Sequence, residues 1–111
     1  MKVNILPEGV TQDMVDNWKK QYGDKNIKLA SLVDKVGNFA LAVIIRVPDR
    51  VVLGEHEKYS YSSPLKAKEI LVKACVLSHK EEVLADDQLF FSAYAAINEV
   101  SPLAKATVED L

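Results

Sequence analysis

One apolar run, FALAVII from Phe39 to Ile45, constrains the fold of this chain more than any other feature. Because nearly every residue in the run is apolar, a strand built from it cannot keep one face in water. Such a strand must lie at the centre of a sheet or be covered on both faces. We therefore expect a buried β-strand with helices packed over it.

The residues before this run predict its partner strand. The segment IKLASLVD, residues 27–34, is rich in β-branched and aliphatic side chains, and Lys28 and Ser31 give it a wetter side. Between the two runs lies KVGN, in which Gly37 and Asn38 can adopt positive φ angles. This pattern predicts a β-hairpin.

The apolar run ends in RVPDR, from Arg46 to Arg50. Pro48 cannot donate a sheet hydrogen bond and pushes Val47 toward extended geometry, whereas Asp49 can cap a following helix. The pentapeptide therefore predicts a switch from strand to helix. The next segment, VVLGEHEKY, is compatible with a short helix that Gly54 weakens.

Capping residues place two further helices. Thr11 as N-cap and Gly23 as C-terminal cap predict a helix over residues 12–22. Ser63 followed by Pro64 marks the start of the clearest helix, SSPLKAKEILVKACVLSHK, whose apolar stripe is formed by Ala67, Ile70, Leu71, Ala74 and Leu77.

The last part of the chain predicts a connector, EEVLADD, and a long final helix capped by Asp86 or Asp87. The tail LAKATVEDL is compatible with a further amphipathic turn or with a frayed end. With 111 residues, 49% of them hydrophobic, the sequence is typical of one packed domain over residues 1–111. We expect an α+β fold: an N-terminal helix, a β-hairpin, then two or three helices packed on the small sheet.

Charge and composition argue against several partners. The 14 basic and 16 acidic residues are dispersed, so no basic stripe is available for nucleic acid. No secretory signal or membrane-spanning run is present, and the single cysteine, Cys75, cannot form an internal disulfide. These features predict a cytoplasmic protein that binds neither nucleic acid nor membrane.

Chemistry-bearing residues are few, and we predict no catalytic residue, no metal site and no cofactor. Cys75 and His79 are four residues apart in the predicted helix and would share a face. A metal site there would need further ligands, such as His56, Glu81 or Asp86. A buried cysteine and a surface histidine explain the same two residues without a metal. Glu55, His56 and Glu57 diverge in direction on a helix, so a solvated polar turn explains GEHEKY better than an acid/base group. Phosphate-binding glycine loops and the serine-hydrolase elbow are absent.

The last helix carries more apolar residues than one side of a small domain needs to bury. Phe90, Phe91 and Tyr94 are our candidates for a partner-binding face on it. A helix sandwiched between the sheet and its neighbour explains the same pattern equally well.

The order of these features resembles a known family. A helix ending in WKKQYG, a hairpin closing on PDR, a helix with EILVKACVL and a DD before an aromatic helix are similar to the small tail assembly chaperones of tailed phages and prophages, over residues 12–100. In this resemblance Pro48, Asp49 and Arg50 form the strand-to-helix corner. The end of the central helix is marked by Cys75 and Leu77, and the start of the last helix by Asp86 and Asp87. None of these residues is catalytic in the family.

The resemblance implies a protein of the bacterial host cytoplasm that holds an elongated, helix-forming partner, the tape measure protein, with many copies bound along it. We therefore expect a non-enzymatic chaperone or assembly adaptor that self-associates. Two alternatives stay open. One is a structural subunit of a phage or other multiprotein particle, and the other is a small metal-dependent enzyme built around Cys75, His79 and His56.

Overall fold

The computed structural model describes residues 6–101 and 107–111. Over these residues the chain forms a two-stranded antiparallel sheet and five α-helices, with one short 3-10 helix before the first strand. The elements in chain order are α1 (Gln12–Tyr22), η1 (Asp24–Asn26), β1 (Ile27–Val33), β2 (Phe39–Arg46), α2 (Arg50–Tyr59), α3 (Pro64–Cys75), α4 (Lys80–Ala85) and α5 (Asp87–Val100).

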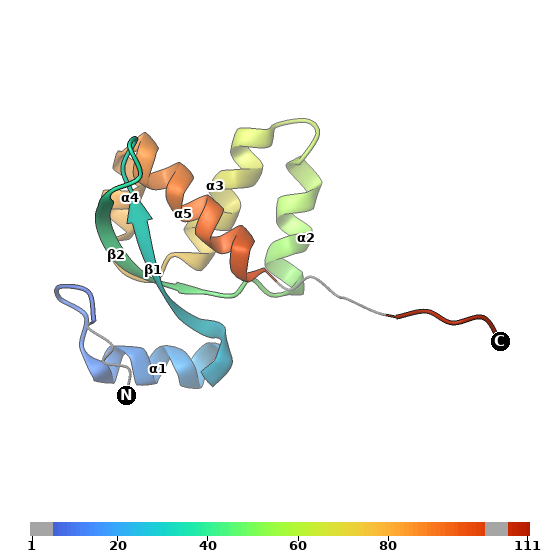
Figure 1. The fold of residues 1–111 in the computed structure, drawn as a ribbon, viewed down its shortest axis with the longest axis horizontal. Coiled ribbons are helices and arrows are strands. Elements are labelled where there is room, and N and C mark those ends of the chain that lie inside the picture. The colour runs from blue at the N-terminus through green and yellow to red at the C-terminus, as the bar shows by residue number, and fades with distance from the viewer. Residues whose placement is uncertain (1–5, 102–106) are drawn as a thin grey trace.

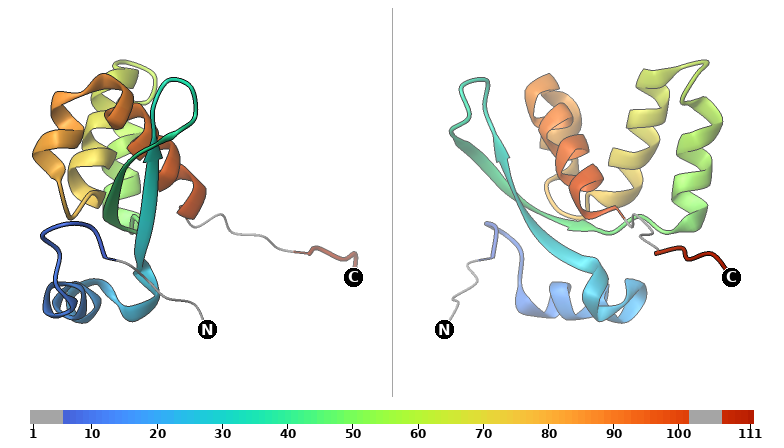
Figure 2. Two further views of the ribbon diagram at one scale, coloured as in Figure 1. Left: turned by 60° about the vertical axis from the view of Figure 1, so that its left-hand side comes forward. Right: turned by 45° about the vertical axis from the view of Figure 1, so that its right-hand side comes forward.

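The elements form an α+β arrangement around the hairpin. Helix α1 lies on one side of the two strands, and α2 to α5 gather on the other side (Figure 1, Figure 2). The α+β class predicted from the sequence is confirmed. Four helices follow the hairpin within the described residues, where two or three were expected.

Helix α1 begins and ends at its predicted caps. The Thr11 hydroxyl accepts a hydrogen bond from the Met14 amide at 3.2 Å, which satisfies one of the amides that a first turn leaves without a helical partner. Gly23 follows the helix with a φ of 104°, and its amide donates to the carbonyl of Lys19 at 2.9 Å. A side chain at this φ would be strained, so glycine is required there.

The turn of the hairpin is held by one carboxylate. The side chain of Asp34 accepts hydrogen bonds from the amides of Val36 and Asn38, both at 3.0 Å. Gly37 has a φ of 87°, as the KVGN turn predicted. The local sequence therefore determines where the two strands meet.

Strand β2 is buried along its second half, as the apolar run predicted, but its first half is not: Phe39 is 65% exposed and Ala40 is also exposed, because the hairpin extends beyond the helices there. Val43, Ile44 and Ile45 are exposed by 0%, 3% and 1%. On the side of β2 away from β1, Val76 forms an isolated antiparallel bridge with Ile45, and the Leu77 amide donates to the Ile44 carbonyl at 2.8 Å. The segment that follows α3 therefore covers the second edge of β2 at Ile44 and Ile45, so that β2 has backbone partners on both sides there.

The RVPDR segment is the predicted switch from strand to helix. Pro48 is buried, and the Asp49 carboxylate caps α2 by accepting from the Val52 amide at 2.9 Å. The predicted short helix after this corner is present despite Gly54 and runs to Tyr59. GEHEKY is therefore part of α2, and our interpretation of it as a polar turn was wrong, because the cap and the packing of α2 on α3 outweigh the low helix propensity of one glycine.

Arg46, the last residue of β2, ties this corner to two other elements. Its Nε donates to the carbonyl of Ala74 in α3 at 2.9 Å, and its guanidinium lies 4.5 Å from the centroid of the Tyr22 ring at the end of α1. It also lies 3.5 Å from the carboxylate of Asp49. One side chain thus joins both sides of the hairpin.

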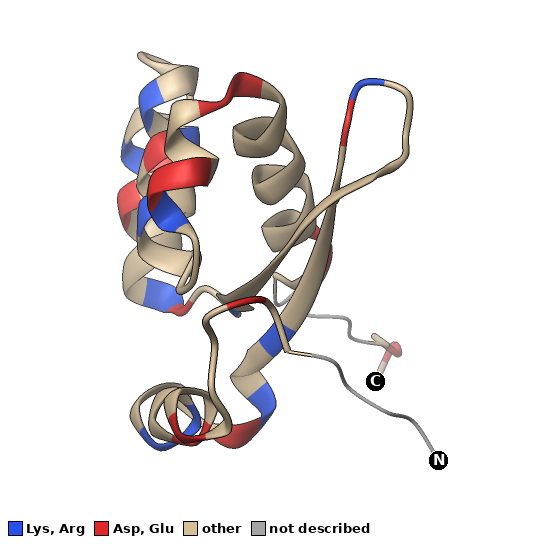
Figure 3. Ribbon diagram, turned by 90° about the vertical axis from the view of Figure 1, so that its left-hand side faces the viewer, with Lys and Arg blue, Asp and Glu red and all other residues tan. Residues whose placement is uncertain are grey.

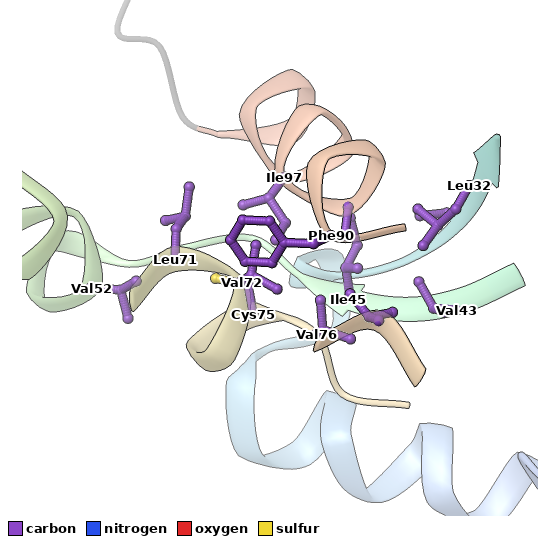
Figure 4. Packing of buried hydrophobic residues seen from close by; sticks show 13 residues of the cluster. Leu32, Val43, Ile45, Val52, Leu71, Val72, Cys75, Val76, Phe90 and Ile97 are labelled. Carbon is purple, nitrogen blue, oxygen red and sulfur yellow. The ribbon is translucent and has the colours of Figure 1, made fainter. Parts of the chain in front are cut away.

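The core lies between the hairpin and the helices α3 and α5. Leu32 from β1 and Val43 and Ile45 from β2 point toward the helices (Figure 4). The helical residues of the core are all nearly inaccessible to water: Val52, Leu71, Val72, Cys75, Val83, Phe90, Ala93 and Ile97.

The segment between α3 and α5 differs from the sequence prediction. Helix α3 starts at Pro64 as expected, although the Ser63 side chain makes no capping hydrogen bond, and it ends at Cys75. The predicted connector EEVLADD forms most of helix α4, because Val83 is fully buried and anchors the segment against the core. Asp86 caps α5 by accepting from the Leu89 amide at 2.9 Å.

After α5 the described residues form no further helix or strand. Helix α5 ends at Val100, before the predicted break at Ser101 and Pro102. The prediction for the tail falls partly outside the described residues, and 107–111 have no regular secondary structure. No helix in the described part of the chain combines the length and apolar character needed to cross a membrane.

Candidate functional site

An open groove between α3, α4 and α5 brings together exposed apolar side chains from three helices. Leu65 of α3, Leu84 of α4 and Phe91 of α5 line it and are 54%, 38% and 47% exposed. The groove has a volume of about 490 Å³. We call these three residues and the surface between them the helical groove.

Charged residues of both signs border the helical groove. Glu69 and Lys73 lie one helical turn apart on α3, and Asp87 opens α5. The helices farthest from the hairpin carry alternating acidic and basic segments (Figure 3). The surface is therefore apolar at its centre and polar at its border, which is the usual organisation of a protein-binding surface.

The structure separates the three aromatic residues predicted to form one partner-binding face. Phe90 is 7% exposed and packs in the core near Val72 and Cys75 (Figure 4), so it contributes at most the floor of the helical groove. Phe91 is exposed in the groove, and its ring meets that of Phe90 edge to face with centroids 5.3 Å apart.

Tyr94 belongs to a different surface. Its hydroxyl lies 3.3 Å from Nε2 of His56 in α2, and the two rings are stacked with centroids 6.1 Å apart. The Nζ of Lys68 lies 5.4 Å from the centroid of the Tyr94 ring. Tyr94 therefore joins α5 to α2 and α3, and the predicted aromatic set is not one continuous face.

The expectation that Cys75 and His79 share a helical face is wrong. Helix α3 ends at Cys75, and His79 has a left-handed backbone conformation with a φ of 56°, so a spacing of four residues no longer places both side chains together. His56 lies on α2 beside Tyr94. Within residues 6–101 and 107–111, no three His, Cys, Asp or Glu side chains are grouped so that they could hold one metal ion.

Burial controls the chemistry of the cysteine. Cys75 is fully buried, and this desolvation raises the pKa of its thiol to about 11. At neutral pH the side chain is a thiol and not the nucleophilic thiolate. It therefore behaves as a small apolar residue of the core.

Two leucines of the helical groove were missed by the sequence analysis. Leu65 lies in the first turn of α3 outside the apolar stripe of that helix, and Leu84 lies in the segment predicted as a connector. A leucine off the stripe is a weak signal, because single exposed apolar residues are common on protein surfaces. Only the packing of three helices brings these residues together.

Comparison of the chain with models of protein families, with curated proteins and with solved structures finds no match.

Proposed function

We propose that this chain is a non-enzymatic, protein-binding assembly chaperone or adaptor, and that the helical groove holds an amphipathic helix of its partner. The observation that carries the proposal is the convergence of Leu65, Leu84 and Phe91 from three helices on one open surface. A groove of this kind binds the apolar face of a helix through residues spaced three and four apart.

The border of the groove supports a helical partner of mixed charge. Lys73 can pair with an acidic residue of the bound helix, and Glu69 or Asp87 with a basic one. Such rim pairs contribute mainly to orientation, because exposed ion pairs are worth at most about 1 kcal/mol. Binding would then depend on the apolar centre and remain reversible, as a chaperone requires.

The groups that could suggest an enzyme have other roles in the structure. Cys75 is buried with a raised thiol pKa, His56 contacts the hydroxyl of Tyr94, and Nδ1 of His79 lies 3.1 Å from Oγ of Ser78. These contacts support the non-enzymatic part of the proposal. An elongated helical protein such as a phage tape measure protein fits the proposed groove, and binding to it would take place in the cytoplasm of the bacterial host.

A binding measurement with one groove variant and one matched control tests this proposal. The probe is an amphipathic peptide of about five helical turns with leucine at every third or fourth position, compared with a scrambled peptide of the same composition. Phe91→Glu should weaken binding of the striped peptide by about tenfold or more, because Phe91 is the largest exposed anchor of the groove. Val51→Glu removes an apolar side chain that is 75% exposed on α2 and should leave binding unchanged.

Two outcomes would contradict the proposal. Equal affinity for the striped and the scrambled peptide would show that the groove does not recognise a helix. Assembly of the purified chain into large particles without any peptide would instead favour a structural subunit. Light scattering of the same samples, repeated with a helical fragment of a tape measure protein, measures the second outcome directly.

A further inference from the structure

Strand β1 uses one of its two edges for the hairpin. The Val47 amide donates to the Asn26 carbonyl at 2.8 Å, and the register continues from Ile27 opposite Arg46 to Leu32 opposite Leu41. In an antiparallel strand, successive residues point their backbone groups to opposite edges. The even-numbered residues of β1 therefore bond to β2, and Ile27, Leu29, Ser31 and Val33 point their amides and carbonyls away from it.

Helix α5 covers the outer edge of β1 at one end. The Val33 amide donates to Oγ of Ser92 at 3.0 Å, and its carbonyl accepts from the Gln88 side chain at 3.4 Å. For Ile27, Leu29 and Ser31, no such partner is found among residues 6–101 and 107–111. The outer edge is thus occupied at Val33 and open over residues 27–31 of the described structure.

The open part of the edge is accessible. Lys28, Leu29 and Ser31 are exposed, Leu29 by 46%, and a groove of about 230 Å³ separates this stretch from Ala96, Glu99 and Val100 at the end of α5. A row of outward amides and carbonyls beside an exposed leucine is complementary to one kind of ligand, another extended strand.

We infer that the outer edge of β1 pairs with the same edge of a second copy of this chain, antiparallel about a two-fold axis at Leu29. In this register Leu29 faces Leu29 of the second copy, and Ile27 faces Ser31. All three outward residues are then used, and each facing pair exchanges two backbone hydrogen bonds. The exposed Leu29 side chains pack against each other at the centre.

The neighbouring registers are less favourable. With the axis at Lys28, the two Lys28 side chains would stand directly opposite each other, and like charges in that position are destabilising. With the axis at Ala30, Ile27 would face Val33, whose outward groups are already bonded to α5. The register about Leu29 avoids both conflicts.

Charge complementarity supports a second copy as the occupant. In the register about Leu29, Lys28 of one copy stands opposite Ala30 of the other, on the side of the sheet that faces the helices. Ala30, Glu99 and Lys28 of the same copy line one groove, and Glu99 makes no ion pair within the described residues, so the incoming lysine arrives beside an acidic side chain that can pair with it. Because the dimer is symmetric about the two-fold axis, this contact between Lys28 of one copy and Glu99 of the other occurs twice.

The register is tested by oxidative cross-linking of the full chain. In an antiparallel pair of this type the Cα atoms are about 5.5 Å apart, which matches the geometry of a disulfide. Leu29→Cys should therefore form a covalent dimer about tenfold faster than Ser31→Cys, an exposed position on the same edge that faces Ile27 instead of itself. The buried Cys75 is common to both variants and does not distinguish them.

Light scattering over a dilution series tests the pairing itself. The unmodified chain should shift from dimer to monomer on dilution, and Leu29→Lys, which places two lysines at the axis, should be monomeric at concentrations where the unmodified chain is dimeric. Phe91→Glu in the helical groove should leave this equilibrium unchanged, which separates the dimer from the proposed helix binding. Circular dichroism verifies that Leu29→Lys is folded.

Either of two results would overturn the inference. Equal rates of cross-linking for the two cysteine variants would show that the copies meet by random collision. A monomer at every concentration would show that the open edge does not pair with a second copy.

Discussion

Strands β1 and β2 share one ladder of hydrogen bonds and differ in what happens at their other edges. On the far side of β2, Ile44 bonds to Leu77 through its carbonyl and to Oγ of Ser78 through its amide. On the far side of β1, side chains of helix α5 form hydrogen bonds with the amide and the carbonyl of Val33. No other outward backbone group of β1 has such a partner within the described residues. One strand is therefore enclosed by its own chain, and the other keeps an edge that a second chain can use.

The difference also appears in side-chain burial. Leu29 and Ile44 face each other in the register, yet Leu29 is 46% exposed and Ile44 is 3% exposed. Both are aliphatic and lie on the same face of the sheet. Their unequal burial shows that position within the tertiary structure, and not residue type, decides how much each contributes to stability.

The largest expected effect comes from truncating these two facing residues. Ile44→Ala should lower the free energy of unfolding by about 2–5 kcal/mol, because a buried aliphatic side chain is removed and a cavity remains. Leu29→Ala should lower it by less than about 1 kcal/mol in the monomer, because water already reaches this side chain. Urea unfolding of both variants at low protein concentration measures the difference, and equal losses would contradict the contrast.

A smaller effect is expected from the two serines that bond to the outer edges of the strands. Ser78 is 6% exposed and accepts from the Ile44 amide at 2.8 Å, so Ser78→Ala leaves a buried amide without a partner at a cost of about 1–3 kcal/mol. Ser92 accepts from Val33 in a half-buried position, where water can replace the hydroxyl. Ser92→Ala should therefore cost about 0.5–1 kcal/mol by the same unfolding measurement. If Ser92→Ala lowered the free energy of unfolding as much as Ser78→Ala, the edge of β1 would be as enclosed as that of β2.

A third effect, smaller than those of Ile44→Ala and Ser78→Ala, concerns the corner that ends β2. The Asp49 carboxylate has a lowered pKa, chiefly because the Val52 amide donates to it, with a further contribution from the guanidinium of Arg46. Asp49→Ala should cost about 1 kcal/mol at neutral pH through loss of the helix cap. Asp49→Asn keeps an oxygen that can cap the helix and is the matched control.

The pH dependence at this corner has a definite sign. Because the folded pKa of Asp49 lies below its ordinary value of 3.8, the carboxylate contributes stability above that pH and loses the contribution as the pH falls through the folded pKa. The advantage of the unmodified chain over Asp49→Ala should therefore shrink below about pH 4. The difference between the Asn and Ala variants should stay constant, and a decline of that difference would assign the effect to another group.

Features that depend on neighbouring residues could be predicted from the sequence. Caps at Thr11 and Asp49 act within three residues of their own position, and both begin helices where expected. The apolar run of β2 predicted a buried strand, because a segment without a polar face has no stable position at a solvated edge, and this holds over Val43, Ile44 and Ile45. Such features arise from local hydrogen bonds or from the average polarity of a short segment.

Features that depend on distant residues could not be predicted in the same way. Helix α4 forms in a segment interpreted as a connector, where burial of Val83 compensates for a helix of only six residues. The residues of the candidate site were incompletely predicted for the same reason. Of the predicted aromatic residues, Phe91 alone is an exposed side chain of the helical groove, while Leu65 and Leu84 come from segments that no local pattern connects.

The sequence by itself determined the α+β class, the hairpin with its buried second strand end and most of the helix boundaries, since these follow from caps, turns and the period of apolar residues. The tertiary structure alone decided which apolar side chains face water and which backbone edge stays open. Periodicity marks an apolar stripe on a helix or strand but does not say which element will cover it. Here α5 covers the edge of β1 at Val33 and leaves residues 27–31 open, a result of where that helix ends against the hairpin.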